Sequence, residues 1–241
     1  MARILLTSWG SHGDVDPYLA LSHALRARGH EPVLAMPAFF RDVVERQGFA
    51  FREVGPDVRP DVTAFVRRIM DARRGSEWLL REAIVPHVER ACEQLEAAAD
   101  GADLVVGHPV AFSAGIVAER RGIPWVSTVL APLSFWSVHD LPVFPPAPWI
   151  KPLAERWPAL APPLMRAVRR ASRDWVAPTV NALRARLRLR AVADPLFEGQ
   201  HSPRRVLAMF PRLLGRPQPD WPPNVTVTGA LVHDAAHRRH R

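Results

Sequence analysis

Short apolar runs alternate with segments in which apolar residues recur every three or four positions through the first half of the chain. Short runs bounded by Gly or Pro predict strands buried on both faces, and the recurring segments predict amphipathic helices packed on a sheet. The predicted strands are residues 2–8, 31–36, 49–54, 102–108 and 123–132. The predicted helices are residues 16–28, 39–48, 62–74, 77–99 and 111–122, the fourth of them kinked or split by Pro86.

Strands that alternate with helices require right-handed crossovers, which make the strands parallel and place helices on both faces of the sheet. We therefore predict an α/β fold with a doubly wound, mostly parallel, Rossmann-like sheet. Residues 132–163 are dense in Pro and large aromatics, and they predict an irregular excursion of the kind that carries recognition. A further helix is predicted at 177–189, and further strands at 204–211 and 225–228.

The composition is typical of a compact globule, because 48% of the 241 residues are hydrophobic. The apolar stretch near the N-terminus is too short for a secretory signal, and no run approaches the roughly 20 apolar residues of a membrane span. We therefore expect a cytoplasmic location. Cys92 is the only cysteine, which excludes an intramolecular disulfide and a cysteine-based zinc site.

The formal net charge of +8 raises the question of a nucleic-acid partner. Basic residues gather in 165–175, 183–190 and 237–241, and nearly all of them are Arg, with Lys151 the only lysine. Such clusters are typical of solvated helix faces in an arginine-biased composition, so no nucleic-acid partner is expected. Strongly salt-dependent retention of DNA would be the evidence for a nucleic-acid-binding function.

The sequence GDVDP, residues 13–17, joins the first predicted strand to the first predicted helix. Asp16 followed by Pro17 predicts the N-cap and the first position of that helix. Asp14 then lies in the turn at the carboxyl end of the strand, where open α/β sheets bind ligands.

Three uses of Asp14 are open from the residues alone. A dinucleotide-binding turn requires Gly-x-Gly-x-x-Gly, whereas Gly10 and Gly13 supply only Gly-x-x-Gly. Asp14 and Asp16 have the spacing of an Asp-x-Asp metal clamp, but a capping role would turn Asp16 towards the helix. The third use is that of a general base, a carboxylate in a partly dry cleft that takes a proton from a hydroxyl nucleophile.

Two long stretches carry a family resemblance: GSHGDVDPYLALSHALRARGHEPVLAMPAFFRDVVERQGFAF, residues 10–51, and DPLFEGQHSPRRVLAMFPRLLGRPQPDWPPNVTVTGAL, residues 194–231. They resemble the N-terminal half of family 1 and family 28 glycosyltransferases of the GT-B fold, especially bacterial antibiotic and sterol glycosyltransferases. The resemblance implies a Rossmann-like acceptor-binding domain over residues 1–230 and the start of an interdomain linker over 231–241. It also implies a donor-binding domain that these residues do not include.

The resemblance implies that Asp14 takes the place of the family's base histidine and removes the proton from an acceptor hydroxyl. The hydroxyl oxygen then attacks the anomeric carbon opposite the departing nucleotide diphosphate, with inversion. The aspartate that orients the base in histidine-type members corresponds to a position at or near His108, which implies a dyad with base and partner exchanged. The alternative is that His108 only ends a strand before Pro109.

The same resemblance places Ser11, His12 and Gly13 against the acceptor or the sugar, with a solvated loop as the alternative for His12. No metal or cofactor is expected, because the nucleotide-diphosphate sugar is a co-substrate held mainly by the missing donor domain. The chain alone is therefore expected to be inactive.

Aromatic residues of the excursion give the only hint of the acceptor. Phe135, Trp136 and Phe144 suit a flat apolar molecule such as a polyketide, sterol, phenolic or lipid, unless they merely hold the excursion to the core. The alternative function is a non-catalytic binding or scaffold subunit that recruits a separate catalytic chain. An apolar face left by the missing domain would then predict a homodimer or a different partner chain.

Overall fold

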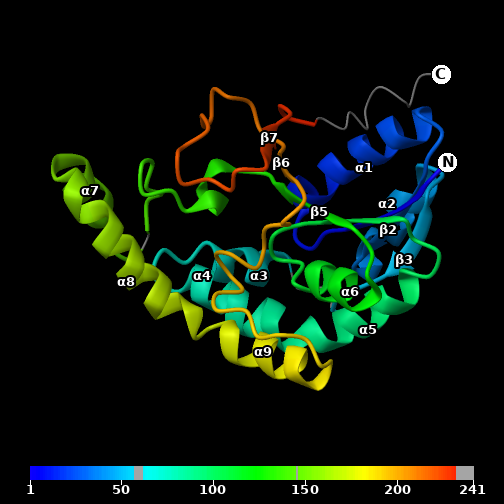
Figure 1. Cartoon of the computed structure of the whole chain (residues 1–241), viewed down its shortest axis with the longest axis horizontal. Coiled ribbons are helices and arrows are strands. Elements are labelled where there is room, and N and C mark those ends of the chain that lie inside the picture. The colour runs from blue at the N-terminus through cyan, green and yellow to red at the C-terminus, as the bar shows by residue number, and fades with distance from the viewer. Residues whose placement is uncertain (57–61, 145, 232–241) are drawn as a thin grey trace.

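The computed structural model describes residues 1–56, 62–144 and 146–231 and shows one parallel sheet flanked by helices (Figure 1). The sheet has seven strands in the order β3-β2-β1-β4-β5-β6-β7, and every pairing is parallel. The strands are β1 (Arg3–Thr7), β2 (Glu31–Met36), β3 (Ala50–Glu53), β4 (Leu104–Gly107), β5 (Trp125–Val129), β6 (Val206–Ala208) and β7 (Val225–Val227). The predicted α/β class and all seven predicted strand positions are confirmed.

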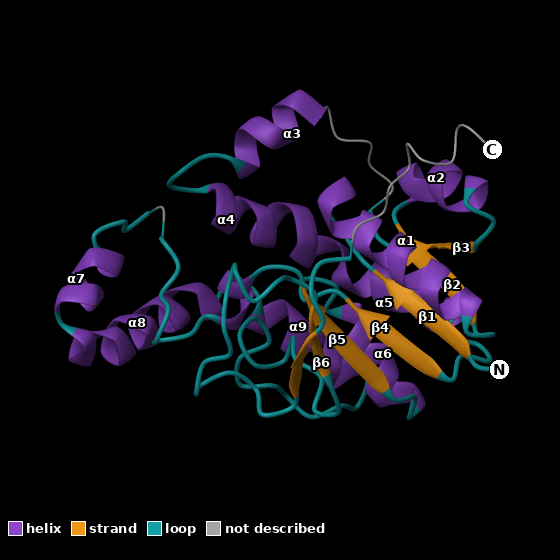
Figure 2. Cartoon of the chain, turned by 90° about the horizontal axis from the view of Figure 1, so that it is seen from above, coloured by secondary structure: helices purple, strands orange, loops and turns teal. Residues whose placement is uncertain are grey.

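Helices lie on both faces of the sheet, and others project away from it (Figure 2). They are α1 (His12–Ala27), α2 (Arg41–Arg46), α3 (Val62–Ile69), α4 (Gly75–Trp78), α5 (Val88–Ala98), α6 (Ser113–Arg121), α7 (Ile150–Arg156), α8 (Ala161–Arg173) and α9 (Ala177–Arg186). The break predicted at Pro86 is confirmed, because a π-helical segment (Leu79–Ile84) and a 3-10 turn (Val85–His87) separate α4 from α5.

Alternation along β1 divides the core into two layers. Leu5 joins the cluster beneath α5, α6 and α9, whereas Ile4 and Leu6 join the cluster beneath α1 and α2. Since successive side chains of a strand point to opposite faces, an unbroken apolar strand is what a sheet covered on both faces requires.

The strand order places a topological switch point between β1 and β4. From β1 the chain proceeds outwards through β2 to β3, and it then returns to the other side of β1 to build β4 to β7. The loops that follow β1 and β4 diverge there, and such a crevice at the carboxyl ends of strands is where open α/β sheets bind ligands.

Three sequence-based expectations need correction. The helix α1 begins at His12 rather than at Asp16, so Asp16 is not its N-cap. The excursion over 132–163 is not wholly irregular, because it contains α7 and the start of α8. The solvated-face interpretation of the basic cluster at 183–190 fails for Arg184, which is buried and pairs with Glu119 at 2.7 Å.

Two further expectations fall partly or wholly on residues beyond those described. The linker expected over 231–241 lies outside the described residues from position 232 onwards, and so does the basic cluster at 237–241. Among the residues that the structure describes, no helix is long and apolar enough to cross a membrane.

Candidate active site at the switch point

The first turn of α1 fixes the Asp14 carboxylate. Ser11 is the N-cap residue, and its backbone N–H donates to Asp14 Oδ2 at 2.7 Å while its hydroxyl donates to the same oxygen at 3.0 Å. The Ser8 hydroxyl, in the loop directly after β1, also restrains this turn, because it donates to the Asp14 backbone carbonyl at 2.8 Å. A carboxylate that reaches back from the third helical position to the N-cap is the arrangement of a capping box. Asp14 therefore has a structural role that the sequence did not reveal.

Gly10 is required for this arrangement. Its φ of +144° is a conformation that L-residues rarely adopt, and a Cβ built there would lie 2.2 Å from Asp14 Oδ2. Only a residue without a side chain lets the carboxylate lie against the backbone of the loop after β1.

His108 approaches the other oxygen of Asp14 from the neighbouring strand. Its backbone N–H donates to the Thr7 carbonyl at 3.0 Å, which ties the end of β4 to the end of β1. The imidazole Nε2 lies 3.5 Å from Asp14 Oδ1, with the His108 side chain only 11% exposed and that of Asp14 33% exposed. The structure thus brings together the two residues proposed as a dyad.

Burial determines the charge of His108. Desolvation lowers the pKa of its imidazole to about 4, although the nearby Asp14 carboxylate acts in the opposite direction. The ring is therefore neutral at pH 7. Because Nδ1 faces the Val110 backbone N–H at 3.5 Å, the proton of the neutral ring is assigned to Nε2, the nitrogen that faces Asp14.

A buried polar contact braces α1 against the sheet beneath the dyad. Tyr18, one helical turn after Asp14, is fully buried, and its hydroxyl lies 2.7 Å from Thr128 Oγ1 on β5. The Thr128 hydroxyl is also 3.4 Å from the Gly107 carbonyl, immediately before His108. This contact connects the helix that carries Asp14 to the strand end that carries His108.

The other residues expected in the opening loop lie at the exposed start of α1. Ser11 and Gly13 are exposed, and the side chain of His12 is 70% exposed. The His12 ring faces Asp16 at 3.5 Å and packs edge-on against Phe40, with the ring centroids 5.4 Å apart. Of the three, only Ser11 hydrogen-bonds to the Asp14 carboxylate.

The aromatic residues of the excursion pack into the core instead of lining the dyad. Phe135 is 5% exposed and stacks on Trp221 with ring centroids 4.0 Å apart. Trp136 stacks on Phe144 at 5.9 Å and meets Phe197 edge-on at 5.0 Å. Their placement matches the core-holding alternative and gives no support to a role in acceptor binding.

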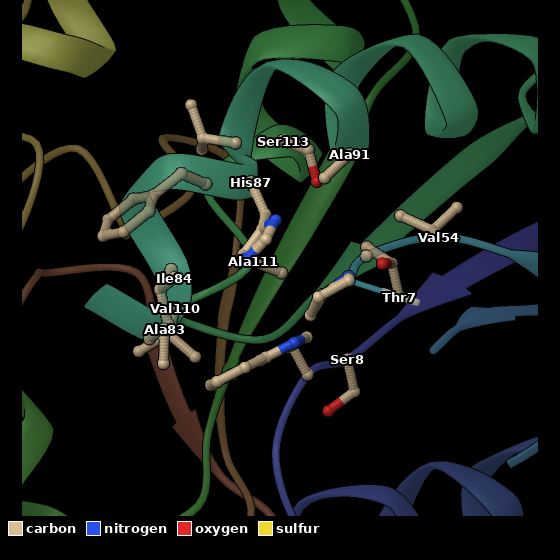
Figure 3. A pocket seen from close by; sticks show the side chains of 15 residues that line it. Thr7, Ser8, Val54, Ala83, Ile84, His87, Ala91, Val110, Ala111 and Ser113 are labelled. Carbon is tan, nitrogen blue, oxygen red and sulfur yellow. The ribbon is translucent and has the colours of Figure 1, made fainter. Parts of the chain in front are cut away.

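A pocket beside the dyad contains residues that the sequence did not single out. Figure 3 shows His87 pointing into it from the turn before α5, with Ser8, Ile84 and Val110 around it. The free volume is about 30 Å³, which is room for about one or two water molecules. Trp9 and Phe112 complete its apolar wall.

The pocket and the dyad share two residues. Ser8 lines the pocket and bonds the Asp14 carbonyl, and Val110 lines the pocket and faces the His108 ring. The pocket lining comes from the ends of β1 and β3, the loop after β4, and the helical segment 83–91 that carries His87. Position directly after a predicted strand was the one signal that could have found the loop residues among them.

The described residues were also compared with the donor sets that bind metal ions. Among the described residues, no group of three or more His, Cys, Asp or Glu side chains is arranged to hold a metal ion. Cys92 is buried, and desolvation raises the pKa of its thiol to about 12, so the thiol is protonated at pH 7.

Residues 4–135 match the glycosyltransferase family 28 N-terminal domain. The chain belongs to this family. One relative, the O-mycaminosyltylonolide 6-deoxyallosyltransferase of Streptomyces fradiae, is 31% identical over 243 residues, which cover 96% of this chain and 55% of the relative. The sterol 3-beta-glucosyltransferase of Glomerella lagenarium is 31% identical over 140 residues, 54% of this chain and 9% of that enzyme.

Solved structures agree with the family assignment at the level of fold. The calicheamicin glycosyltransferase CalG4 superposes with a TM-score of 0.60 at 18% identity, covering 95% of this chain and 53% of CalG4. The fold is therefore the Rossmann-like domain of the GT-B glycosyltransferases. This family 28 chain spans about half the length of the tylonolide relative and of CalG4.

Proposed function

We propose that this family 28 domain is the acceptor-binding half of an inverting glycosyltransferase, with Asp14 as the base. The observation that carries the proposal is the contact of Asp14 and His108, 3.5 Å apart at the switch point of the sheet. Contacts of this length are common in ligand-free sites and shorten when substrate binds.

The roles within the dyad follow from charge and exposure. A neutral His108 has its Nε2–H 3.5 Å from Asp14 Oδ1, so in the proposed mechanism it donates to the carboxylate once this contact shortens, and it orients the base without accepting the proton itself. The Asp14 side chain is a third exposed, which leaves it accessible to an incoming hydroxyl. His108 is thus a positioning residue for Asp14.

The proposed step is a single displacement. The acceptor hydroxyl loses its proton to Asp14, its oxygen forms the bond to the anomeric carbon, and the bond to the nucleotide diphosphate breaks with its electron pair leaving on the diphosphate. Attack from the face opposite the leaving group inverts the anomeric centre. The donor nucleotide is expected to be held by residues beyond this chain, which spans 55% of the tylonolide relative.

The lining of the pocket beside the dyad, and not its present volume, is the basis for proposing an apolar acceptor. Trp9, Ile84 and Phe112 provide the apolar surface, and His87 provides one polar group. A sterol-sized molecule exceeds the free volume, so the pocket must open to admit it. We propose that the segment between α4 and α5, which lines the pocket through Ile84 and His87, is the part that moves. That segment is π-helical and 3-10 helical, backbone types that often occur at functional sites.

Turnover by a complete enzyme tests the assignment of the base. We expect Asp14→Asn, made in this chain joined to the donor half of the tylonolide relative, to lower kcat by about 10²- to 10⁴-fold with KM for the sugar donor unchanged. Asp42→Asn makes the same change at an exposed position in the first turn of α2, and this matched control should leave kcat within about threefold. Near-normal turnover of Asp14→Asn would refute Asp14 as the base.

A further inference from the structure

The helices α7 and α8 and their connection form a helical hairpin, residues 150–173. This hairpin and the residues just before it present apolar side chains to solvent. Nine large hydrophobic side chains are exposed among the described residues, and four of them lie within 143–160: Val143, Trp149, Trp157 and Leu160. Trp157 is 58% exposed and Trp149 57% exposed. Pro158, Ala159, Pro162 and Pro163 are also exposed, so residues 157–163 form an apolar tip.

This exposure does not come from an unpacked hairpin. The inner faces of α7 and α8 bury Ile150, Ala154, Ala161 and Met165 in a small cluster of their own, which includes Phe144. The hairpin is therefore a packed unit, and its exposed apolar residues do not belong to its core. Large exposed apolar patches of this kind mark interaction sites.

Basic side chains surround the tip. Residues 143–174 contain six basic and two acidic residues, half of the formal net charge of the chain. Arg166 and Arg170 are exposed on the outer face of α8, and the structure gives neither an ion pair within the described residues. Arg156 lies over the Trp157 ring, with its guanidinium carbon 5.4 Å from the ring centroid.

The hairpin projects from the body of the domain. In Figure 1, α7 and the first part of α8 occupy one end of the long axis, and Figure 2 shows them at the same extremity from above. The tip is therefore a convex protrusion. A standard protein interface involves about 20–30 residues of each partner, more than this tip presents, whereas exposed Trp and Leu beside Arg suit the interface of a lipid bilayer.

We propose that this tip, with Arg156, Arg166 and Arg170, docks the domain on an anionic lipid surface. Trp and Leu side chains fit the boundary between headgroups and acyl chains, and Arg guanidinium groups pair with lipid phosphates at the same depth. The charge of the hairpin is complementary to an anionic leaflet, which attracts clustered basic residues. The docking does not depend on the transfer reaction.

Co-sedimentation of the full chain with phosphatidylcholine vesicles containing phosphatidylglycerol tests the proposal. We expect binding that weakens with salt and is lost on pure phosphatidylcholine. Trp157→Ser with Leu160→Ser, and separately Arg166→Glu with Arg170→Glu, should each weaken binding by about tenfold or more.

Matched controls separate the tip from general properties of the surface. Leu213→Ser with Leu214→Ser changes side chains that are 93% and 63% exposed in the loop after β6. Arg212→Glu with Arg216→Glu makes the same change in net charge on exposed positions of that loop. Both controls should bind vesicles like the unmodified chain.

Three results would overturn the proposal. The first is absence of binding to the anionic vesicles, and the second is equal loss in the tip variants and the controls, which would indicate non-specific charge attraction. The third is a tip variant that keeps vesicle binding but dissociates an oligomer, which would make the tip a protein contact. Circular dichroism of each variant confirms that the fold is retained.

Discussion

At the scale of single residues, the Asp14 carboxylate is held on both of its oxygens. Ser11 holds Oδ2 through two hydrogen bonds, and His108 faces Oδ1 from the adjacent strand. A carboxylate fixed in this way has one orientation, which suits a base that must meet a hydroxyl at a defined angle. The same restraints explain why a helix cap and a candidate catalytic group coincide in one residue.

Gly10→Ala is predicted to displace Asp14, since the new methyl group would lie 2.2 Å from Oδ2, closer than two non-bonded atoms can approach. In the joined enzyme, kcat should fall by about a hundredfold, because small misplacements of a reacting group have large effects on rate. Gly29→Ala is the control, since Gly29 also has a positive φ, +81°, but nothing lies within 4 Å of its added Cβ. If both variants lose kcat equally, backbone strain and not displacement of Asp14 is the cause.

The buried neutral His108 predicts a specific dependence of stability on pH. Its pKa is 6.5 in the unfolded chain and about 4 in the folded chain. Between these values the unfolded chain binds a proton that the folded chain does not, so the free energy of unfolding falls as the pH is lowered from 6.5 to 4. The loss attributable to His108 is on the order of 3 kcal/mol.

Urea unfolding of the unmodified chain and of His108→Asn measures this contribution. The stability of the two proteins should converge, or reverse in order, as the pH falls from 7 to 4. Titrating groups away from His108, including the half-buried His201, whose pKa is also lowered to about 4 by burial, are common to both proteins and cancel in the difference. A difference that is constant over this pH range would contradict the neutral state of buried His108.

At the scale of elements, α1 is attached to the sheet by one buried polar contact as well as by apolar packing. Thr128→Val should destabilise the chain by about 1–3 kcal/mol, because the Tyr18 hydroxyl would be left buried without a partner. Tyr18→Phe should cost only about 1 kcal/mol, because Thr128 keeps the Gly107 carbonyl as acceptor.

A double-mutant cycle by urea unfolding checks this asymmetry. The double variant should be more stable than the sum of the two single losses predicts, because each single change leaves part of one shared contact behind. Additive losses would show that the two hydroxyls do not depend on each other.

The same scale shows what the sequence could and could not predict. β2 was predicted at its observed bounds, because apolar runs between Gly and Pro identify buried strands. The N-cap of α1 was misplaced by five residues, because Asp16-Pro17 is a strong local signal whereas the Ser11 cap depends on a contact with Asp14. Local chemistry alone does not decide between two nearby caps.

The candidate site was predicted in part for a related reason. The pairing of Asp14 with His108 came from the family resemblance and lies where the switch point places it. The pocket residues Trp9, His87 and Phe112 were missed, because they come together only when the loops after β1 and β4 meet the turn before α5. Phe135 was predicted to bind the acceptor because it is a large aromatic residue in the excursion. In the structure it packs into a buried cluster instead.

At the scale of the whole molecule, the domain presents two features on different parts of its surface. The dyad and its pocket lie at the carboxyl ends of the central strands, and the Arg-rich hairpin lies at one end of the long axis (Figure 1). The proposed acceptor recognition and the proposed surface docking are therefore predicted to be separable by mutation. The residues that match family 28, 4–135, include both Asp14 and His108.

Calorimetric titration of this chain tests the proposed acceptor-binding function most directly. Apolar hydroxylated molecules, including a sterol and a macrolide aglycone, would be titrated beside UDP, dTDP and their sugars. The account predicts that at least one apolar acceptor binds and that the nucleotides do not. Tight binding of a nucleotide without any acceptor would contradict it, because the donor site would then lie within these 241 residues.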